Sequence, residues 1–386
     1  MSSALDSEAD SPLRILHIYK DYFPVLGGIE NHVKVLAEAQ AARGHDVTTL
    51  VANPGRRTVV EMANGVRLVK AGRWGTLAST PISPAMFCWV ARLEADVAHL
   101  HFPHPPGEVA HLLFGRTKRT VITYHSDIVR QRTLRTVYHP LLRYVLRRAD
   151  RLIATSATYI GSSRYLRHLR DKCVIIPIGA DVERFDHVDP AHVESLRQRF
   201  FPQPDRQPTL VFVGRLRYYK GLDDLLRALP KIPQAHLLVV GDGPMRAPWE
   251  QLAHELNLAG RVTFTGDVDD ADLPACYKLG DLFVLPANAR AEAFGTVIVE
   301  AMASGLPVVS TEVGSGTSWV NLAGTTGSIV PPRDPKALAE AINALLSDPA
   351  RRAEMGRAAH QRAHAEFSQV AMIQRVEQVY REVLAG

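Results

Sequence analysis

Short apolar runs alternate with helical stretches along most of the 386 residues, and this alternation constrains the fold more than any other feature. The first unit has an apolar run at 13–19, a Gly27-Gly28 pair, a helical pattern at 29–43 and a second apolar run at 47–51. A strand, a glycine loop, a helix and a second strand, in this order, open a doubly wound parallel sheet. We therefore predict an α/β fold, although a Gly-Gly pair alone is more often only a turn.

The alternation is interrupted once, in the middle of the chain, and then resumes. Residues 186–208 are rich in proline and charge and fit a linker, and a new strand is expected from Thr209. A chain of this length also favours two cores over one. We expect a disordered tail at 1–12, an N-terminal doubly wound domain at 13–185, the linker at 186–208, a C-terminal doubly wound domain at 209–366 and an amphipathic helix at 367–386.

The second half contains an apolar run at 281–285, then a polar loop, then a helix predicted at 295–304. Backbone N–H groups in the first turn of a helix have no intrahelical partner and can bind an anion. Here they belong to Phe294, Gly295 and Thr296. This segment therefore predicts an anion site at the end of a buried strand.

Two carboxylates flank this predicted anion site. Glu292 stands just before it, and Glu300 lies one turn beyond Thr296 on the same helix face. Either acid alone is typical of a helix cap or a solvated helix residue. Together with the open helix end, they suit a ligand that carries both hydroxyls and phosphates, such as a nucleotide sugar.

A glycine-bounded loop at 214–221 follows the strand that begins the second domain, and it carries Arg215 and Lys220. One basic residue in a loop is usually a solvated surface residue without a binding role. Two of them after a parallel strand suit a diphosphate, because a guanidinium forms paired hydrogen bonds and an ammonium adds a movable charge.

His125 and Asp127 follow a strand predicted at 120–124, and ligands of open parallel sheets bind at such strand ends. The acid two residues after His125 makes this histidine a functional candidate. His99 and His101 are equally compatible with a core or a rim position.

Three segments resemble the motifs of retaining GT-B glycosyltransferases of family 4. The first is E-A-F-G-x-x-x-x-E-A-M-A-x-G-x-P-V-V, which starts at Glu292. The second is G-R-L-x-x-x-K-G at 214–221, and the third is P-x-G-V-D-x-x-x-F at 177–185, with Ala180 in the usual valine place. The resemblance covers nearly the whole chain.

This resemblance implies a GT-B fold, in which two Rossmann-like domains face each other across a cleft and a C-terminal helix, here 367–386, completes the first domain. It also implies retention of the anomeric configuration, with the leaving phosphate as the base. The implied catalytic residues are Glu292, His125 and, on the acceptor side, Asp127. The donor diphosphate would bind Arg215, Lys220, Gly28, Gly295 and Thr296, and the donor sugar would bind Glu292, Phe294, Gly295 and His125. The nucleoside would bind Glu300, Gly241 and Val268.

Segments 124–131 and 315–321 look like those of mannosyltransferases from bacterial surface-polysaccharide synthesis. We therefore expect transfer of mannose from GDP-mannose to a lipid-linked saccharide. A UDP-hexose donor and a nucleotide-sugar 2-epimerase of the same fold remain alternatives, as does a sugar-nucleotide binder without activity. A phosphorylase is less favoured, because no pyridoxal-phosphate lysine context is present. Since Arg215, Lys220 and helix N-termini can neutralise the diphosphate, we predict no metal cofactor.

The remaining composition bears on location and partners. Three scattered cysteines without a CxxC pair indicate a reducing compartment, and the polar, acidic start at 1–12 does not resemble a signal peptide. Residues 116–172 hold 14 basic and three acidic side chains. This excess is compatible with a solvated helix face, but it also suits an anionic membrane surface or a phosphorylated acceptor. No nucleic-acid motif is present. We expect a cytoplasmic protein, peripheral on the inner face of the membrane.

Overall fold

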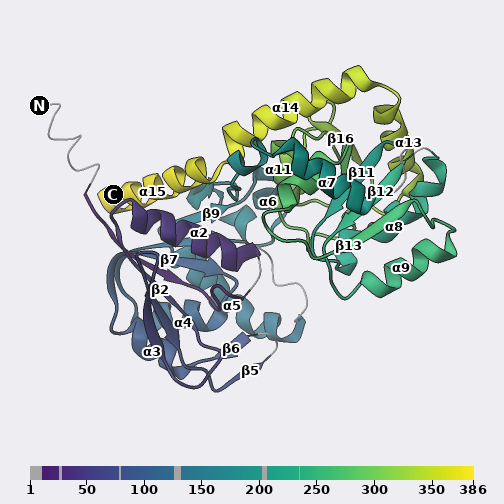
Figure 1. The fold of residues 1–386 in the computed structure, drawn as a ribbon. Helices are drawn as coiled ribbons and strands as arrows, with labels where there is room; N and C mark the ends of the chain where they lie inside the picture. The colour runs from purple at the N-terminus through teal and green to yellow at the C-terminus, as the bar shows by residue number, and fades with distance from the viewer. Residues whose placement is uncertain (1–10, 26–27, 78–79, 126–131, 202–206, 234) are drawn as a thin grey trace, which may run out of the picture. The chain divides into compact units, whose positions relative to one another are not determined.

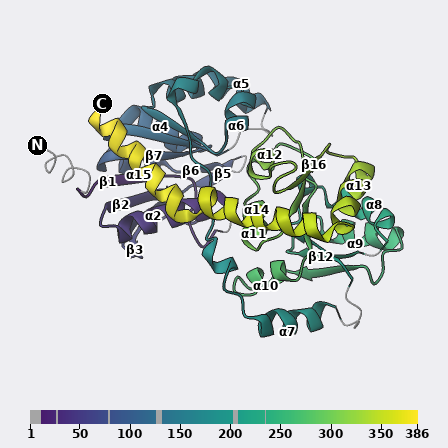
Figure 2. The same cartoon turned by 90° about the horizontal axis from the view of Figure 1, so that it is seen from above.

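The computed structural model describes residues 11–25, 28–77, 80–125, 132–201, 207–233 and 235–386 (Figures 1 and 2). By their contacts these residues divide into two compact units. The first unit comprises the chain up to Thr155 together with Ser163–Pro177 and Met372–Gly386. The second comprises Ser156–Ser162 and Ile178–Ala371.

The first unit is built on a sheet with the strand order β10-β9-β8-β7-β1-β2-β4-β3. All neighbouring strands are parallel except β3 and β4, which form an antiparallel pair at one edge. The strands are β1 (Arg14–Ile18), β2 (Asp46–Ala52), β3 (Val59–Ala63), β4 (Val66–Ala71), β7 (Glu94–Phe102), β8 (Arg116–Tyr124), β9 (Arg151–Ala154) and β10 (Cys173–Ile175); β5 (Gly75–Leu77) and β6 (Thr80–Ile82) form a separate hairpin.

Amphipathic helices cover this sheet. In α2 (Gly28–Ala42) the side chains of Val33, Leu36 and Ala37 recur at helical spacing and are fully buried. The C-terminal part of α15 (Gln369–Ala385) lies beside α2 in both views (Figures 1 and 2). Arg43, which directly follows α2, forms an ion pair of 3.2 Å with Glu377 of α15. The other helices of this unit are α3 (Pro84–Val90), α4 (Pro105–Phe114) and α5 (Arg132–Arg148).

The second unit has an entirely parallel sheet with the order β13-β12-β11-β14-β15-β16. Its strands are β11 (Thr209–Val213), β12 (His236–Val240), β13 (Val262–Gly266), β14 (Leu282–Leu285), β15 (Val308–Thr311) and β16 (Gly327–Val330). β11, β12 and β14 are short, almost continuously apolar and buried, as strands covered by helices on both faces must be. The chain order reverses direction across the sheet between β11 and β14, so this pair is the topological switch point.

The helices of the second unit are α6 (Ala157–Ser162), α7 (Pro190–Phe200), α8 (Leu222–Ala228), α9 (Arg246–Glu255), α10 (Leu273–Lys278), α11 (Thr296–Ala303), α12 (Thr317–Val320), α13 (Pro335–Leu346) and α14 (Pro349–Phe367). Within the segment predicted as a linker, α7 packs Leu196 and Phe200 into the core of this unit. In the central helix α11, Ile298, Val299, Ala301 and Met302 are fully buried, whereas Val297 is only partly buried.

The prediction of doubly wound α/β architecture is confirmed in both units. Each has parallel strands joined by helices, and the alternation seen in the sequence is the alternation of these elements. Among the described residues, no helix combines the length and the apolar character needed to cross a membrane.

Candidate functional site

The loops that follow β11 and β14 meet at the switch point of the second unit. The backbone N–H of Asn288 donates to the carbonyl of Tyr219 over 2.9 Å. Gly221 has a φ of +69°, and a Cβ atom added there would lie 2.0 Å from the carbonyl oxygen of Pro286. Only glycine fits this close approach of two backbones. The 214–221 loop and the loop before α11 therefore form one structural unit.

Lys220 and Glu292 lie at the centre of this junction. The ammonium nitrogen of Lys220 is 2.8 Å from Oε2 of Glu292, and both residues are buried. The lysine head also covers Gly214, where an added Cβ atom would lie 3.2 Å from Nζ. The structure thus brings together the basic residue and the carboxylate that the sequence singles out in two separate motifs.

The N-terminus of α11 opens next to this pair. Gly295 precedes the helix with a φ of +78°, and Thr296 is its first residue. The side chain of Phe294 is buried against Trp319 and Phe367, with ring centroids 6.5 and 6.0 Å away. The phenyl ring therefore belongs to the core, and Phe294 can offer a sugar or phosphate its backbone N–H but not its side chain.

Glu300 lies one turn further along α11 and is half-buried. The hydroxyl of Tyr277 donates to its Oε2 over 2.7 Å. Burial raises the pKa of Glu300, and the hydrogen bond from Tyr277 works against that rise. In the described part of the chain this arrangement leaves Oε1 available to accept from a ligand hydroxyl.

Glycines stack where β11, β12 and β13 end. The N–H of Gly241 donates to the carbonyl of Gly266 over 2.9 Å, and a Cβ atom added at Gly241 would lie 2.5 Å from the carbonyl oxygen of Gly214. Nearby, Arg215 is exposed, and Val268 is partly buried against the core. Backbone rather than side chains thus covers this edge of the sheet, which a flat nucleoside can approach closely.

The sequence also contains two Asp-x-Asp runs, at 267–269 and 270–272. Such pairs are potential metal ligands, but two of their acids have basic partners here. Arg184 forms an ion pair with Asp270 over 3.0 Å, and His192 contacts Asp272 over 2.9 Å. Asp270 and Asp272 are thus each engaged by a basic side chain.

In the first unit, His125 directly follows β8 and is 4% exposed. Its ring lies edge-on to His32 of α2, with centroids 4.9 Å apart, and its Nε2 is 3.2 Å from Nδ1 of His101. Gly28, the first residue of α2, is exposed. Asp127 lies outside the described residues, so its predicted role stays a prediction.

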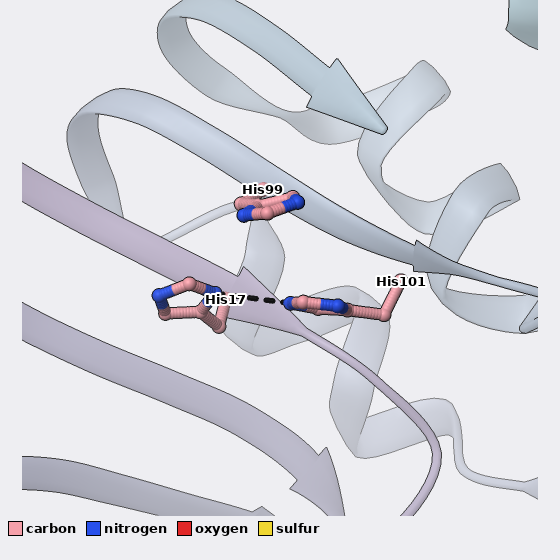
Figure 3. A group of neighbouring side chains, drawn as sticks. All are labelled: His17, His99 and His101. Atoms are coloured by element: carbon pink, nitrogen blue, oxygen red, sulfur yellow. Dashed lines mark hydrogen bonds between the residues drawn. The ribbon is translucent and has the colours of Figure 1, made fainter. Parts of the chain in front are cut away.

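His125 belongs to a histidine cluster that sequence reasoning did not identify. It consists of His17, His32, His99, His101 and His125, all of them buried (three are shown in Figure 3). Burial lowers the pKa of His17 and of His32 to about 4, and lowers the pKa of the other three well below its ordinary value. The spacing of two residues between His99 and His101 indicates that both lie on the same face of the sheet, and the sequence could have shown this. The pairing of His17 with His99 depends on strand register, which the sequence does not reveal.

The fold and the site define an α/β ligand-binding protein of the doubly wound class. Residues 195–362 match the family described as glycosyl transferases group 1, and residues 26–184 match the one described as Glycosyltransferase Family 4. The chain belongs to glycosyltransferase family 4 and is a glycosyltransferase of the GT-B type. The resemblance noted in the sequence is thereby confirmed.

Individual relatives agree with this assignment. The chain is 38% identical to the D-rhamnosyltransferase WbpZ of Pseudomonas aeruginosa, over 92% of each chain. It is 32% identical to the O-antigen chain mannosyltransferase C of Escherichia coli, over 96% of this chain and 99% of the relative. Among solved structures, sucrose-phosphate synthase from Thermosynechococcus elongatus superposes with a TM-score of 0.76 at 26% identity, over 96% of this chain and 99% of that one.

Proposed function

We propose that this glycosyltransferase moves mannose from GDP-mannose to a lipid-linked saccharide, with retention of the anomeric configuration and without a metal ion. The observation that carries the proposal is the buried Lys220–Glu292 pair at the switch point, beside the open N-terminus of α11. A cation and an oriented helix end suit a diphosphate, and a carboxylate next to them suits the sugar attached to it.

The donor diphosphate would bind Arg215, Lys220 and the backbone N–H groups of Gly295 and Thr296, with Gly28 as a further backbone contact. Lys220 is paired with Glu292. A diphosphate would compete for the lysine and leave the carboxylate free to face the sugar. These fixed charges would stabilise the leaving phosphate, which is the role a divalent cation has in other enzymes.

The sugar would be held by Glu292 and the backbone N–H groups of Phe294 and Gly295, and His125 of the first unit would also bind it. Breakage of the glycosidic bond develops positive charge on the sugar, and the Glu292 carboxylate would stabilise that charge. His125 would accept a hydrogen bond from a sugar hydroxyl and orient the ring. The leaving phosphate would take the proton of the incoming acceptor hydroxyl on the same face, with Asp127 as an acceptor-side partner.

The nucleoside would occupy the glycine-lined edge of the sheet. Glu300, held by Tyr277, would accept hydrogen bonds from the ribose hydroxyls. Gly241 allows the backbone to approach the nucleoside, and Val268 offers an apolar contact for the base.

A second candidate donor sugar is D-rhamnose, because the relative with 38% identity carries that sugar in its name. D-rhamnose is the 6-deoxy form of D-mannose, so one site can recognise the configuration that both sugars share. Parallel assays with GDP-mannose and its 6-deoxy analogue separate the two: preference for the 6-deoxy sugar would replace mannose in the proposal.

The acceptor would reach the enzyme from an anionic membrane surface. On α5, Arg143, Arg147 and Arg148 are exposed, opposite the buried Leu142 and Val145. Arg143 and Arg147 also line a polar depression with Arg164 and Arg167. Several cations on one surface attract anionic lipid headgroups, at roughly 1 kcal/mol each near the membrane. Binding to phosphatidylglycerol vesicles that salt abolishes is expected; equal binding to neutral vesicles would contradict this part.

Calorimetric titration with GDP, UDP and ADP, first with EDTA and then with magnesium, tests the donor assignment. We expect GDP to bind most tightly and magnesium to add little. A preference for UDP would keep the transferase but refute the mannosyl assignment, and release of an epimerised sugar without any acceptor would favour a 2-epimerase. Binding of none of them would refute the donor site.

A further inference from the structure

A chain of hydrogen bonds runs through the histidine cluster of the first unit and ends at His125. Oε1 of Gln40 lies 2.8 Å from Nε2 of His17. Nδ1 of His17 lies 3.1 Å from Nε2 of His101, as Figure 3 shows. Nδ1 of His101 in turn lies 3.2 Å from Nε2 of His125. Three imidazoles and one amide from α2, β1, β7 and the end of β8 are thus connected in series.

The carbonyl oxygen of Gln40 determines where every proton in this series sits. It can only accept, so the proton of His17 is on Nε2, and its Nδ1 accepts from His101. His101 must then carry its proton on Nε2 and accept through Nδ1 from His125. His125 carries its proton on Nε2 as well. Its Nδ1 is left as an acceptor, and this buried atom has no hydrogen-bond partner among the described residues.

This assignment requires neutral rings, and the surroundings provide for that. Gln40, His17 and His101 are completely buried, and in the described residues no carboxylate lies within hydrogen-bond distance of the three rings. A protonated imidazole would therefore be a buried charge without a counterion, which is unfavourable. Neutral rings each have one donor and one acceptor, and the series uses both at His17 and His101.

Existing hydrogen bonds compete with a divalent metal ion at His17, His99 and His101. Nitrogen atoms of His17, His99 and His101 lie within 4.8 Å of one another, as metal ligands would. However, His99 already contacts the hydroxyls of Tyr380 and Thr123 over 2.5 and 2.6 Å.

We propose that Gln40, His17 and His101 form a positioning relay, which holds His125 in the Nε2–H tautomer and presents Nδ1 as the acceptor for a substrate hydroxyl. The substrate part rests on the proposed function, in which His125 lines the donor sugar. The tautomer part is a property of the free protein. His17, His101 and Gln40 never touch the substrate, so they would act only through His125.

The tautomers can be measured directly by ¹⁵N NMR of the full chain labelled at histidine, without any ligand. Long-range couplings distinguish a protonated from an unprotonated ring nitrogen, and we expect Nε2–H on His17, His101 and His125 at neutral pH. Nδ1–H on His125 would overturn the proposal, and so would metal present in stoichiometric amount in the purified protein.

Gln40→Leu tests whether the amide sets this pattern, and Thr123→Val is its matched control. Thr123 is equally buried and contacts the histidine cluster, but only through His99, outside the relay. We expect Gln40→Leu to shift His125 toward the Nδ1–H tautomer and to lower kcat for GDP release from GDP-mannose on the order of tenfold, with little change in KM. Thr123→Val should change neither the tautomer nor kcat.

Each other outcome is decisive. An unchanged tautomer in Gln40→Leu or an equal shift in Thr123→Val would overturn the relay. A shifted tautomer with unchanged kcat would overturn the part of the proposal in which Nδ1 of His125 accepts from a substrate hydroxyl. If the wild-type protein does not turn over GDP-mannose, the donor assignment fails, while the NMR result still decides whether the relay exists.

Discussion

The ammonium of Lys220 and the carboxylate of Glu292 form an ion pair of 2.8 Å whose side chains are 9% and 10% exposed. The pair joins the loop after β11 to the loop before α11, and both loops lie at the switch point of the second sheet. A buried pair of this kind rarely stabilises a fold more than apolar side chains would, and it is costly to break. Its position at the switch point is one reason for the donor site proposed above.

Removing one partner of this pair should destabilise the protein, and removing both should restore much of the loss. Lys220→Met leaves a buried carboxylate unpaired, and we expect a loss of roughly 3 kcal/mol in the free energy of unfolding. Adding Glu292→Leu should recover most of that loss, as measured by urea unfolding. The exposed pair Lys336–Glu340 is the control, where Lys336→Met should change stability by less than about 0.5 kcal/mol. Additive losses in the double variant would contradict this account.

Arg215 and Arg217 are both exposed in the same loop, but only Arg215 is assigned to the diphosphate. Arg215→Ala should weaken GDP binding by about tenfold, because a charge-assisted hydrogen bond to the diphosphate is lost. Arg217→Ala should leave it unchanged. Titration calorimetry measures the affinity of both variants for GDP and for pyrophosphate. An equal loss of affinity in the two variants would show that Arg215 contributes only as part of the general surface charge.

Gly221 and Gly260 share a left-handed backbone, with φ values of +69° and +78°, but differ in their surroundings. A Cβ atom at Gly221 would collide with the carbonyl of Pro286, whereas no heavy atom lies within 4 Å of one at Gly260. Gly260→Ala should therefore cost only the backbone strain, about 1–2 kcal/mol. Gly221→Ala should cost clearly more and should also weaken GDP binding. Equal losses of stability in Gly221→Ala and Gly260→Ala would show that the close contact between the 214–221 loop and the loop before α11 does not contribute to stability.

Acid should destabilise the first unit through its histidines. An unfolded histidine titrates near pH 6.5, while burial lowers the folded pKa of His17 and His32 to about 4. Between these values the unfolded state binds more protons, so stability is complete above about pH 7 and falls as the pH drops toward 4, by roughly 1.4 kcal/mol per pH unit for each histidine. Urea unfolding at several pH values measures this slope. His17→Met should reduce this slope by about one histidine's share, and substitution of the exposed His254 by Gln should leave it unchanged. A stability that is flat from about pH 7 to pH 5 would contradict the burial argument.

The sequence was sufficient to predict the local features of the fold and the site. Buried parallel strands can be recognised as short apolar runs, because both of their faces are covered by helices. The residues that directly follow such strands lie at the edge of the sheet where ligands bind. Lys220 and Glu292 were found in this way, each from its own loop, and the structure places them in contact.

Features that depend on distant pairing could not be predicted. The histidine cluster exists because β1 and β7 pair with His17 opposite His99, a register that the local sequence does not encode. The hydrogen bond from Tyr277 to Glu300 joins two helices in the same way. Phe294 lies in a recognisable motif, but its ring packs against Trp319 and Phe367, because core packing rather than the motif determines where an aromatic ring points.

The central claim is that Glu292 stabilises the donor sugar while Lys220 and its neighbours hold the diphosphate. The most direct test is the rate of GDP release from GDP-mannose, with EDTA present, by the wild-type protein and by Glu292→Gln, together with the GDP affinity of both. The account predicts that Glu292→Gln binds GDP at least as tightly as wild type, because Lys220 is no longer held by a carboxylate, while its turnover falls on the order of a hundredfold. Unchanged turnover in Glu292→Gln, with GDP affinity intact, would contradict it.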